Sequence, residues 1–395
     1  MTFMFTTSSR VLIAVLWLPW FVCAEVPGLE TSDPLSLDGY IKYTLTSTQY
    51  KDTTELDQLV TQRLNATYQF DDAWQWHTSI RSVFASTNSS NSQSTLLLDD
   101  NTNFMDLSNT WLDKKEAVGQ SALDRLYVDW QDKNYLVRLG RFRVNWGMTT
   151  VWNPNDIFNA YSIYDIDYPE GAGTDALYVT KTLDYASEIN WVYSPNENKE
   201  RDSYSARYLF NVNGWDGQAI ISQSKINRVV GFGFSGDIKG AAFRGETSWF
   251  EPLGSHWKNT NERLDQALVT SMETRYHVGG VRNWMITAAI LHTTNPVDAT
   301  DNLKELGAAA SARALSFSEL TGYVDMSFDL SSLHRVTLLS SYYQDNSYFY
   351  GITSNYSLAS CSSLVFVLQR FDGPVDSVFG QSQNTILSAS IDWAF

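Results

Sequence analysis

Apolar and polar residues alternate with a period of two along most of the chain, and long helical patterns are absent. The stretch GYIKYTL, residues 39–45, carries Ile41, Tyr43 and Leu45 on one face and Lys42 on the other. Such alternation predicts β-strands with one apolar and one polar face. About sixteen runs of this kind recur up to the last residue, each near the ~10-residue length of a transmembrane strand.

The connections between these runs alternate between short and long. Asp71-Asp72 is one of the short ones, whereas the long, polar ones include 86–121, 142–175 and 343–384. Short periplasmic turns at one end and long extracellular loops at the other are typical of outer-membrane barrels. The sequence therefore predicts an all-β fold, a transmembrane antiparallel β-barrel of about 16 strands. A strand at 361–371, with a partner near 347–356, would make 18; alternatively 361–371 belongs to the last long loop.

The chain ends in the middle of an alternating run, QNTILSASIDWAF, whose apolar face includes Ile391, Trp393 and Phe395. A closed barrel has no edge strand, so its last strand needs no polar tail. The ending also resembles the terminal signal that the assembly machinery of Gram-negative outer-membrane barrels recognises. We predict that these three residues face lipid and form the assembly signal. A soluble secreted β-sandwich or propeller would not explain an apolar face on nearly every strand.

The first 24 residues have the pattern of a secretory signal peptide. Arg10 precedes the apolar run VLIAVLWLPWFV, and Ala24 ends a segment suited to cleavage. The run is too short for the ~20 residues of a membrane-spanning helix. We predict that residues 1–24 are removed, that residues 25–395 form the barrel, and that the protein lies in the outer membrane of a Gram-negative cell.

The segment 142–175 breaks the alternation and is rich in aromatic and acidic residues. It contains Trp146, Trp152, Asp156, Asp165 and Asp167. So many large side chains prefer burial, which makes an ordinary surface loop a poor explanation. We predict that 142–175 folds into the barrel and forms a constriction.

The start of this segment resembles a porin-like family of Gram-negative outer-membrane β-barrels. The resemblance rests on Gly-Arg at 140–141, Trp-Gly at 146–147 and Asn-Pro-x-Asp at 153–156, within a stretch of about forty residues. It implies an architecture, and it says nothing about the solute.

Cations occur on the polar faces of the first strands, and they suggest how a constriction could work. These cations are Lys42, Arg63, Arg81, Arg125 and Arg138. If 142–175 folds inward, Asp156, Asp165 and Asp167 could face this basic wall, with Trp146 and Trp152 beside them. Opposed charges across a water-filled narrowing would orient dipolar solutes. The alternative is that they are ordinary solvated lumen residues paired across neighbouring strands.

The predicted function is a porin-like channel for passive diffusion of small hydrophilic solutes, embedded in outer-membrane lipid after insertion by the barrel-assembly machinery. A homotrimer is compatible with this prediction. The alternative is a barrel that acts through its long extracellular loops as a receptor, adhesin or assembly partner, which the 86–121 and 343–384 segments favour.

Other functional classes have little support. The formal net charge of −16 disfavours a nucleic-acid partner. The stretch GFGFSG, residues 231–236, lies inside an alternating strand and precedes no helix, so it does not indicate dinucleotide binding. The five histidines lack the HExxH spacing of a metal site. We therefore predict no enzyme activity, no cofactor and no metal.

Overall fold

The computed structural model describes residues 33–51, 53–88, 103–160, 170–171, 173–197, 199–224, 226–254, 265–296 and 311–395. The predicted signal peptide, residues 1–24, lies outside the described residues, as do Asp165 and Asp167. Within the described ranges, no helix is long and apolar enough to cross a membrane.

The described chain is almost entirely β-structure. Its elements are β1 Leu35–Tyr50, β2 Thr54–Gln69, β3 Trp74–Thr87, β4 Ser108–Lys114, β5 Ala117–Asp132, β6 Tyr135–Phe142, β7 Thr174–Asp184, β8 Ser187–Ser194, η1 Lys199–Arg201, β9 Ser203–Val212, β10 Trp215–Ser224, β11 Asn227–Ile238, β12 Ala241–Pro252, β13 Ala267–Val278, β14 Trp284–Thr293, β15 Leu320–Ser331, β16 His334–Tyr343, β17 Tyr348–Ala359, β18 Ser362–Asp372, α3 Val378–Gln381 and β19 Asn384–Ala394.

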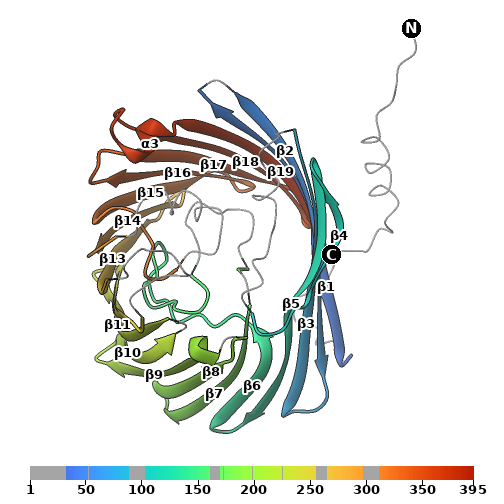
Figure 1. Ribbon diagram of the computed structural model, residues 1–395, viewed down its shortest axis with the longest axis vertical. Helices are drawn as coiled ribbons and strands as arrows, with labels where there is room; N and C mark the ends of the chain where they lie inside the picture. Colours follow the sequence, from blue (N-terminus) through green and yellow to red (C-terminus); the bar gives the residue numbers. More distant parts are fainter. Residues whose placement is uncertain are drawn as a thin grey trace.

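The strands form one closed antiparallel barrel (Figure 1). Each wall strand pairs with its neighbours in the chain, and β1 closes the ring by pairing with β19. The strand β4 is not counted among the strands that close the ring, because β3 pairs directly with β5 and, among the described strands, β4 pairs with β5 alone. The wall therefore has eighteen strands, an even number as in bacterial outer-membrane barrels.

The larger of the two predicted strand numbers is correct. Segments 347–356 and 361–371 correspond to β17 and β18, so the expected long loop 343–384 is wrong. The alternation of β17 is weak because Phe349 is buried inside the barrel, whereas Ser354 lies on the outer face. When apolar residues face inward and polar residues face outward on one strand, the alternation of the sequence does not indicate that strand clearly.

The two ends of the barrel differ as predicted. At one end the strands are joined by short turns, among them Asn213-Gly214 and Lys239-Gly240. All four of these residues have positive φ, between 54° and 85°, which matches the two-residue type I′ hairpins of twisted antiparallel strands. Longer connections, such as 143–173 between β6 and β7, emerge at the opposite end.

The outer face of the wall is apolar and the inner face is polar. Leu139, Ile221 and Leu387 are exposed on the outside, whereas Ser271 and Thr287 are buried inside. This is the inverse of a soluble protein and is the pattern of a transmembrane barrel. Ile391 and Trp393 of β19 and the following residue, Phe395, share the outer face. β1 lies in register beside them, and the Phe395 N–H donates to the Gly39 carbonyl at 2.9 Å. That these residues are an assembly signal stays a prediction.

Candidate functional site

The chain leaves the wall at the end of β6 and enters the barrel. Residues 143–160, here called the inner segment, lie within the ring of strands (Figure 1). Just before the departure, Gly140 has a φ of 129°, and a Cβ there would overlap the carbonyl oxygen of Leu126. Only glycine fits this conformation without strain. The Gly-Arg pair at 140–141 therefore marks the point where the wall strand ends.

A buried ion pair joins the two ends of the excursion. Arg141 Nε lies 2.7 Å from Asp175 Oδ1 and Arg141 Nη2 lies 2.9 Å from Asp175 Oδ2, and the two side chains are 2% and 3% exposed. The Met105 backbone N–H donates to the same carboxylate at 2.7 Å, and Arg141 donates to the Met105 carbonyl. Since Arg141 precedes the inner segment and Asp175 follows it, this bidentate pair fixes the base of the excursion.

The strand β4 fills the gap that β6 leaves in the wall. β6 pairs only with the part of β5 from Leu126 onward. The earlier part of β5 pairs with β4 instead, for example Lys114 with Ala117. The predicted loop 86–121 therefore contains a strand, and the wall stays hydrogen-bonded where the chain turns inward.

The apolar side chains of the inner segment pack against the later wall strands. The buried cluster contains Val144, Trp146, Val151, Trp152, Ile157 and Phe158 from the inner segment and Ile220, Val229, Phe250, Val269 and Leu291 from β10–β14. Trp146 and Trp152 are 1% and 3% exposed, so they do not line a water-filled pore as predicted. Burial of such large apolar surfaces instead attaches the inner segment to the wall.

Two wall carboxylates hold the backbone of the inner segment. Glu246 on β12 accepts from the backbone N–H groups of Met148, Thr149 (2.7 Å) and Asn155 (3.0 Å). Glu273 on β13 accepts from the Thr150 N–H at 2.7 Å.

Glu273 also bonds to the Val151 N–H at 3.1 Å and to Arg244 Nη1 at 2.9 Å. The irregular backbone has no strand neighbour, so these carboxylates supply acceptors that the fold would otherwise lack. No pattern in the sequence pointed to this role of Glu246 and Glu273.

The Asn-Pro-x-Asp motif has a structural role in the same attachment. The Asn155 side chain donates to the Phe232 carbonyl at 3.0 Å and accepts from Ser248 Oγ at 2.7 Å. The Gln218 amide donates to the Trp146 carbonyl at 2.8 Å. The inner segment is thus bonded to four consecutive wall strands, β10 to β13.

Asp156 is fully buried and does not face the basic wall, contrary to prediction. Its Oδ1 accepts from the Asn159 N–H at 3.3 Å, and its Oδ2 lies 3.8 Å from Nη2 of Arg143. Burial raises the pKa of Asp156 to about 7, although Arg143 opposes the shift. Asp156 therefore bonds to residues of the inner segment itself. It is not the negative charge that was predicted to face the arginines of the wall.

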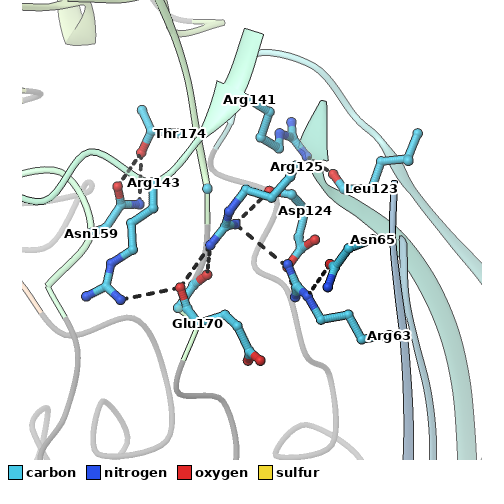
Figure 2. Close-up of polar contacts among 12 residues, drawn as sticks. Arg63, Asn65, Leu123, Asp124, Arg125, Arg141, Arg143, Asn159, Glu170 and Thr174 are labelled. Carbon is cyan, nitrogen blue, oxygen red and sulfur yellow. Dashed lines mark hydrogen bonds and ion pairs between the residues drawn. The ribbon is translucent and has the colours of Figure 1, made fainter. Parts of the chain in front are cut away.

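The predicted cations Lys42, Arg63 and Arg81 lie on the inner faces of β1, β2 and β3. Arg63 and Arg81 are directly opposite each other in the β2–β3 register. Arg63 Nη1 forms a 2.6 Å ion pair with Asp124 Oδ2, and Arg63 Nε donates to Asn65 at 2.9 Å (Figure 2). Both arginines are more than nine-tenths buried, so they act on the lumen through the field of their charge and not by direct contact with a solute.

A β-bulge brings Arg125 into the same cluster. Ser79 pairs with Arg125 and Ile80 pairs with Leu123, so Asp124 is an extra residue. Figure 2 shows the Asp124 carboxylate beside Arg63, with Arg125 on the same side of the wall.

Arg125 Nη2 donates to the carbonyls of Glu170 and Gly171, both at 2.8 Å, while the Glu170 carboxylate accepts from Tyr40 at 3.4 Å. The returning end of the excursion is therefore bonded to the basic wall. Alternation alone did not reveal the role of Asp124, because its partner Arg63 is distant in sequence.

Arg138 lies apart from the other four cations. It forms a bidentate pair with Asp129, at 2.6 and 2.7 Å, and its guanidinium lies over the Tyr127 ring at 4.5 Å. His77 also stacks on Tyr127, with ring centroids 4.6 Å apart. Asp129 thus balances the charge of Arg138, and this pair lies nearer the short-turn end of the barrel than the other cations.

Known proteins resemble this chain in fold and not in sequence. No family model matches the sequence, and no curated protein matches it. OccAB1 from Acinetobacter baumannii superposes with a TM-score of 0.58, at 9% identity, over 94% of this chain and 99% of that one. OccK8 (OprE) from Pseudomonas aeruginosa gives 0.57 at 10% identity, over 91% and 98%. The chain shares the fold of these barrels. OccK5 (OpdH) from Pseudomonas aeruginosa gives 0.56 at 8% identity, over 91% and 98%.

Proposed function

We propose that the protein is a porin-like outer-membrane channel through which small hydrophilic solutes diffuse passively. The observation that carries this proposal is the closed wall of eighteen strands with the inner segment packed on one side of it. Narrow barrels are filled by their own side chains, whereas barrels of about 16–18 strands have room for an aqueous channel. An inner segment attached to β10–β13 narrows such a lumen and leaves the opposite wall available to solutes.

The charges support a solute path along the β1–β5 wall. Lys42, Arg63, Arg81 and Arg125 lie there, with the Asp124 and Glu170 carboxylates among them. Glu246 and Glu273, on the other side, are occupied by backbone N–H groups. We infer that the narrowest part of the lumen has an excess of positive charge and favours anions over cations.

The same proposal assigns the membrane orientation. The short turns would face the periplasm and the long connections the exterior, as in other barrels of this class. Residues 1–24 would direct export, and Phe395 with Trp393 and Ile391 would be recognised by the barrel-assembly machinery. The porin-like family resemblance of 140–156 agrees with this assignment.

A second candidate function is recognition of a partner by the long-loop end. A separate aromatic cluster orders that end, with Phe317 stacked on Tyr343 at 4.6 Å and Phe379 packed on both. A rigid platform of this kind suits a receptor or adhesin. Deleting residues 89–102, which leaves β4 in place, separates a pore from a receptor that binds through this connection: the pore would keep conducting, whereas the receptor would lose its partner.

Solute-dependent swelling of liposomes tests the proposal. Liposomes that contain the refolded mature chain should swell in isotonic solutions of small sugars or amino acids and not in solutions of large polysaccharides. Liposomes with the heat-unfolded chain provide the background rate. Folded, inserted protein that gives only the background rate would contradict the channel.

A further inference from the structure

An apolar groove crosses the outer face of the barrel over β17, β18, β19, β1 and β2. It has a volume of about 360 Å³. The small residues Ser47, Ser354 and Ala389 lie in it between larger ones such as Leu56 and Phe366. The small side chains leave a recess in the wall, and a hydrocarbon chain in this recess is in contact with protein on several sides. The groove is therefore shaped to hold an acyl chain.

The position of the groove in the membrane follows from β19. On this strand Ala389 lies four residues from Trp393, at the short-turn end, and four from Thr385, toward the opposite end. Eight residues of a strand span ~26 Å, which a tilt of about 40° reduces to ~20 Å along the membrane normal. The apolar band of such barrels is about 25 Å tall, so Thr385 lies near its far edge. Tyr348 and Tyr350 of β17, which are exposed on the outer face and stacked at 6.4 Å, mark the aromatic girdle of this edge.

A positioned arginine lies between the groove and this edge of the membrane. Arg370 is on the outer face of β18, two residues beyond Leu368, which lines the groove. Its Nη1 donates to Thr385 Oγ1 at 2.9 Å, and its Nε and Nη2 donate to Asp372 Oδ2 at 3.1 and 2.7 Å. Asp372 also accepts from the Gly373 N–H at 2.8 Å. These bonds hold the guanidinium in one orientation.

The guanidinium of Arg370 has capacity for a further acceptor. Within the described part of the chain three of its five N–H groups are used, and two remain. The side chain is 27% exposed, at the depth where lipid headgroups begin. Arginine binds phosphate oxygens through directed N–H groups. Because Asp372 balances part of the charge, the site favours a headgroup that carries hydroxyl or amide groups beside its phosphate. The hydroxyls of Thr385 and Tyr350, which pair with Arg370 in register, can bond to such groups.

We propose that the groove and Arg370 together bind one molecule of lipid A, the phosphorylated and acylated disaccharide of lipopolysaccharide. One acyl chain fills the groove, a phosphate bonds to Arg370, and sugar groups bond to Thr385 and Tyr350. The site rests on the proposed orientation, because lipopolysaccharide forms the leaflet that faces the exterior. A cation at this edge is not sufficient: Arg228 of β11 is 65% exposed on the outer face, but β11 does not line the groove.

Native mass spectrometry of the mature chain, titrated with lipid A in mild detergent, tests this site. One lipid A should remain bound to each wild-type chain. Arg370→Gln and Ala389→Trp, which fills the groove, should each weaken this binding at least tenfold. Arg228→Gln is the matched control, because it also removes an outer-face cation at the long-connection end, and it should bind as the wild type does. Heat-dependent gel migration verifies that each variant is folded.

Two further probes identify the headgroup. Lipid A without its phosphates and phosphatidylglycerol should each bind the wild-type chain at least tenfold more weakly than intact lipid A does. Equal binding of phosphatidylglycerol would contradict a glycolipid site.

Three other results would overturn the proposal. They are Arg370→Gln binding as tightly as the wild type, Arg228→Gln losing as much affinity as Arg370→Gln, and a lipid-free dimer that Ala389→Trp separates. The last result would assign the groove to a second copy of the chain. Lipid binding is measured without conduction, so a chain that conducts but binds no lipid A would contradict this site and leave the channel standing.

Discussion

The two sides of the barrel use charge differently. On β12 and β13, Glu246 and Glu273 bind backbone N–H groups of the inner segment. On β2 and β5, Arg63 and Arg125 bind a wall carboxylate and the backbone carbonyls of 170–171. Each side thus supplies the hydrogen-bond partners that the irregular backbone needs. The later side supplies acceptors for backbone N–H groups, and the earlier side supplies donors for backbone carbonyls.

This difference shows why a buried lumen charge need not be a solute contact. The carboxylates of the later side bind the backbone of the inner segment, and apolar packing strengthens this attachment. On the earlier side, Lys42, Arg63, Arg81 and Arg125 outnumber the Asp124 and Glu170 carboxylates that lie among them. Attachment of the inner segment and selectivity therefore belong to opposite walls, and substitutions should separate them.

The largest effect should come from the ion pair at the base of the excursion. Arg141→Ala leaves the Asp175 carboxylate buried and without its cation, and we expect the free energy of unfolding to fall by about 3–5 kcal/mol. Denaturant titration of the refolded barrel, followed by tryptophan fluorescence, measures the change. Arg228→Ala is the control, because the Arg228–Glu251 pair is largely exposed and should contribute little. Equal effects of the two substitutions would contradict the assigned role of Arg141.

Glu246→Leu should release the inner segment from the later wall. Three buried N–H groups lose their acceptor, and at roughly 1 kcal/mol each the loss is about 3 kcal/mol. Limited proteolysis should cut within 143–160 at least tenfold faster in this variant than in the wild type. Glu188→Leu removes another inner-face carboxylate that does not contact the segment and should leave the cleavage rate unchanged. Unchanged cleavage in Glu246→Leu would show that packing alone attaches the segment.

Asp156 should make stability depend on pH. Its pKa in the folded chain, about 7, is above the ordinary value near 4, so the folded state favours the protonated carboxyl. This contribution to stability is full below about pH 4 and is lost as the pH rises through 7. We expect a loss of about 1–3 kcal/mol between pH 5 and pH 8. Denaturant titrations at both pH values should show a smaller loss for Asp156→Asn, and an unchanged loss would exclude Asp156 as its source.

Gly140→Ala should strain the point where the chain leaves the wall. The residue has a positive φ, and the added Cβ meets the Leu126 carbonyl, so we expect a loss of about 1–3 kcal/mol. Gly322→Ala is a suitable comparison, because a Cβ there meets open space on the outer face of β15. Denaturant midpoints measure both effects. A midpoint for Gly140→Ala equal to that of Gly322→Ala would remove the argument for a required glycine.

The sequence was sufficient for the architecture and insufficient for the site. Alternation assigned the faces of β1 and β19 correctly, because both faces of these strands are consistent in polarity. It failed for β17, where Phe349 faces inward and Ser354 outward. The aromatic content of 142–175 indicated burial, which the structure has, yet Trp146, Trp152 and Asp156 are buried too completely to line a pore.

The missing information is spatial. Several features of the site join residues that are distant in sequence. They are the bulge at Asp124, the replacement of β6 by β4 beside β5, and the bonds of Glu246 to Met148 and Asn155. The insertion in β5 shifts the phase of the alternation, since Asp124 and Arg125 stand together between Leu123 and Leu126, but a phase shift does not show which residues lie opposite. Such pairings become visible only when the strands are placed next to one another.

The most direct test of the central claim is single-channel conductance of the refolded protein in a planar bilayer, with the reversal potential measured under a salt gradient. The account predicts steady conductance and a reversal potential of the sign that indicates anion preference. Replacing both Arg81 and Arg125 by Gln should shift that potential toward the cation side, whereas Arg138→Gln should change it less, because Asp129 balances Arg138. Folded barrels that do not conduct, or a cation preference that the arginine substitutions leave unchanged, would contradict a channel whose selectivity is set by the charge of the basic wall.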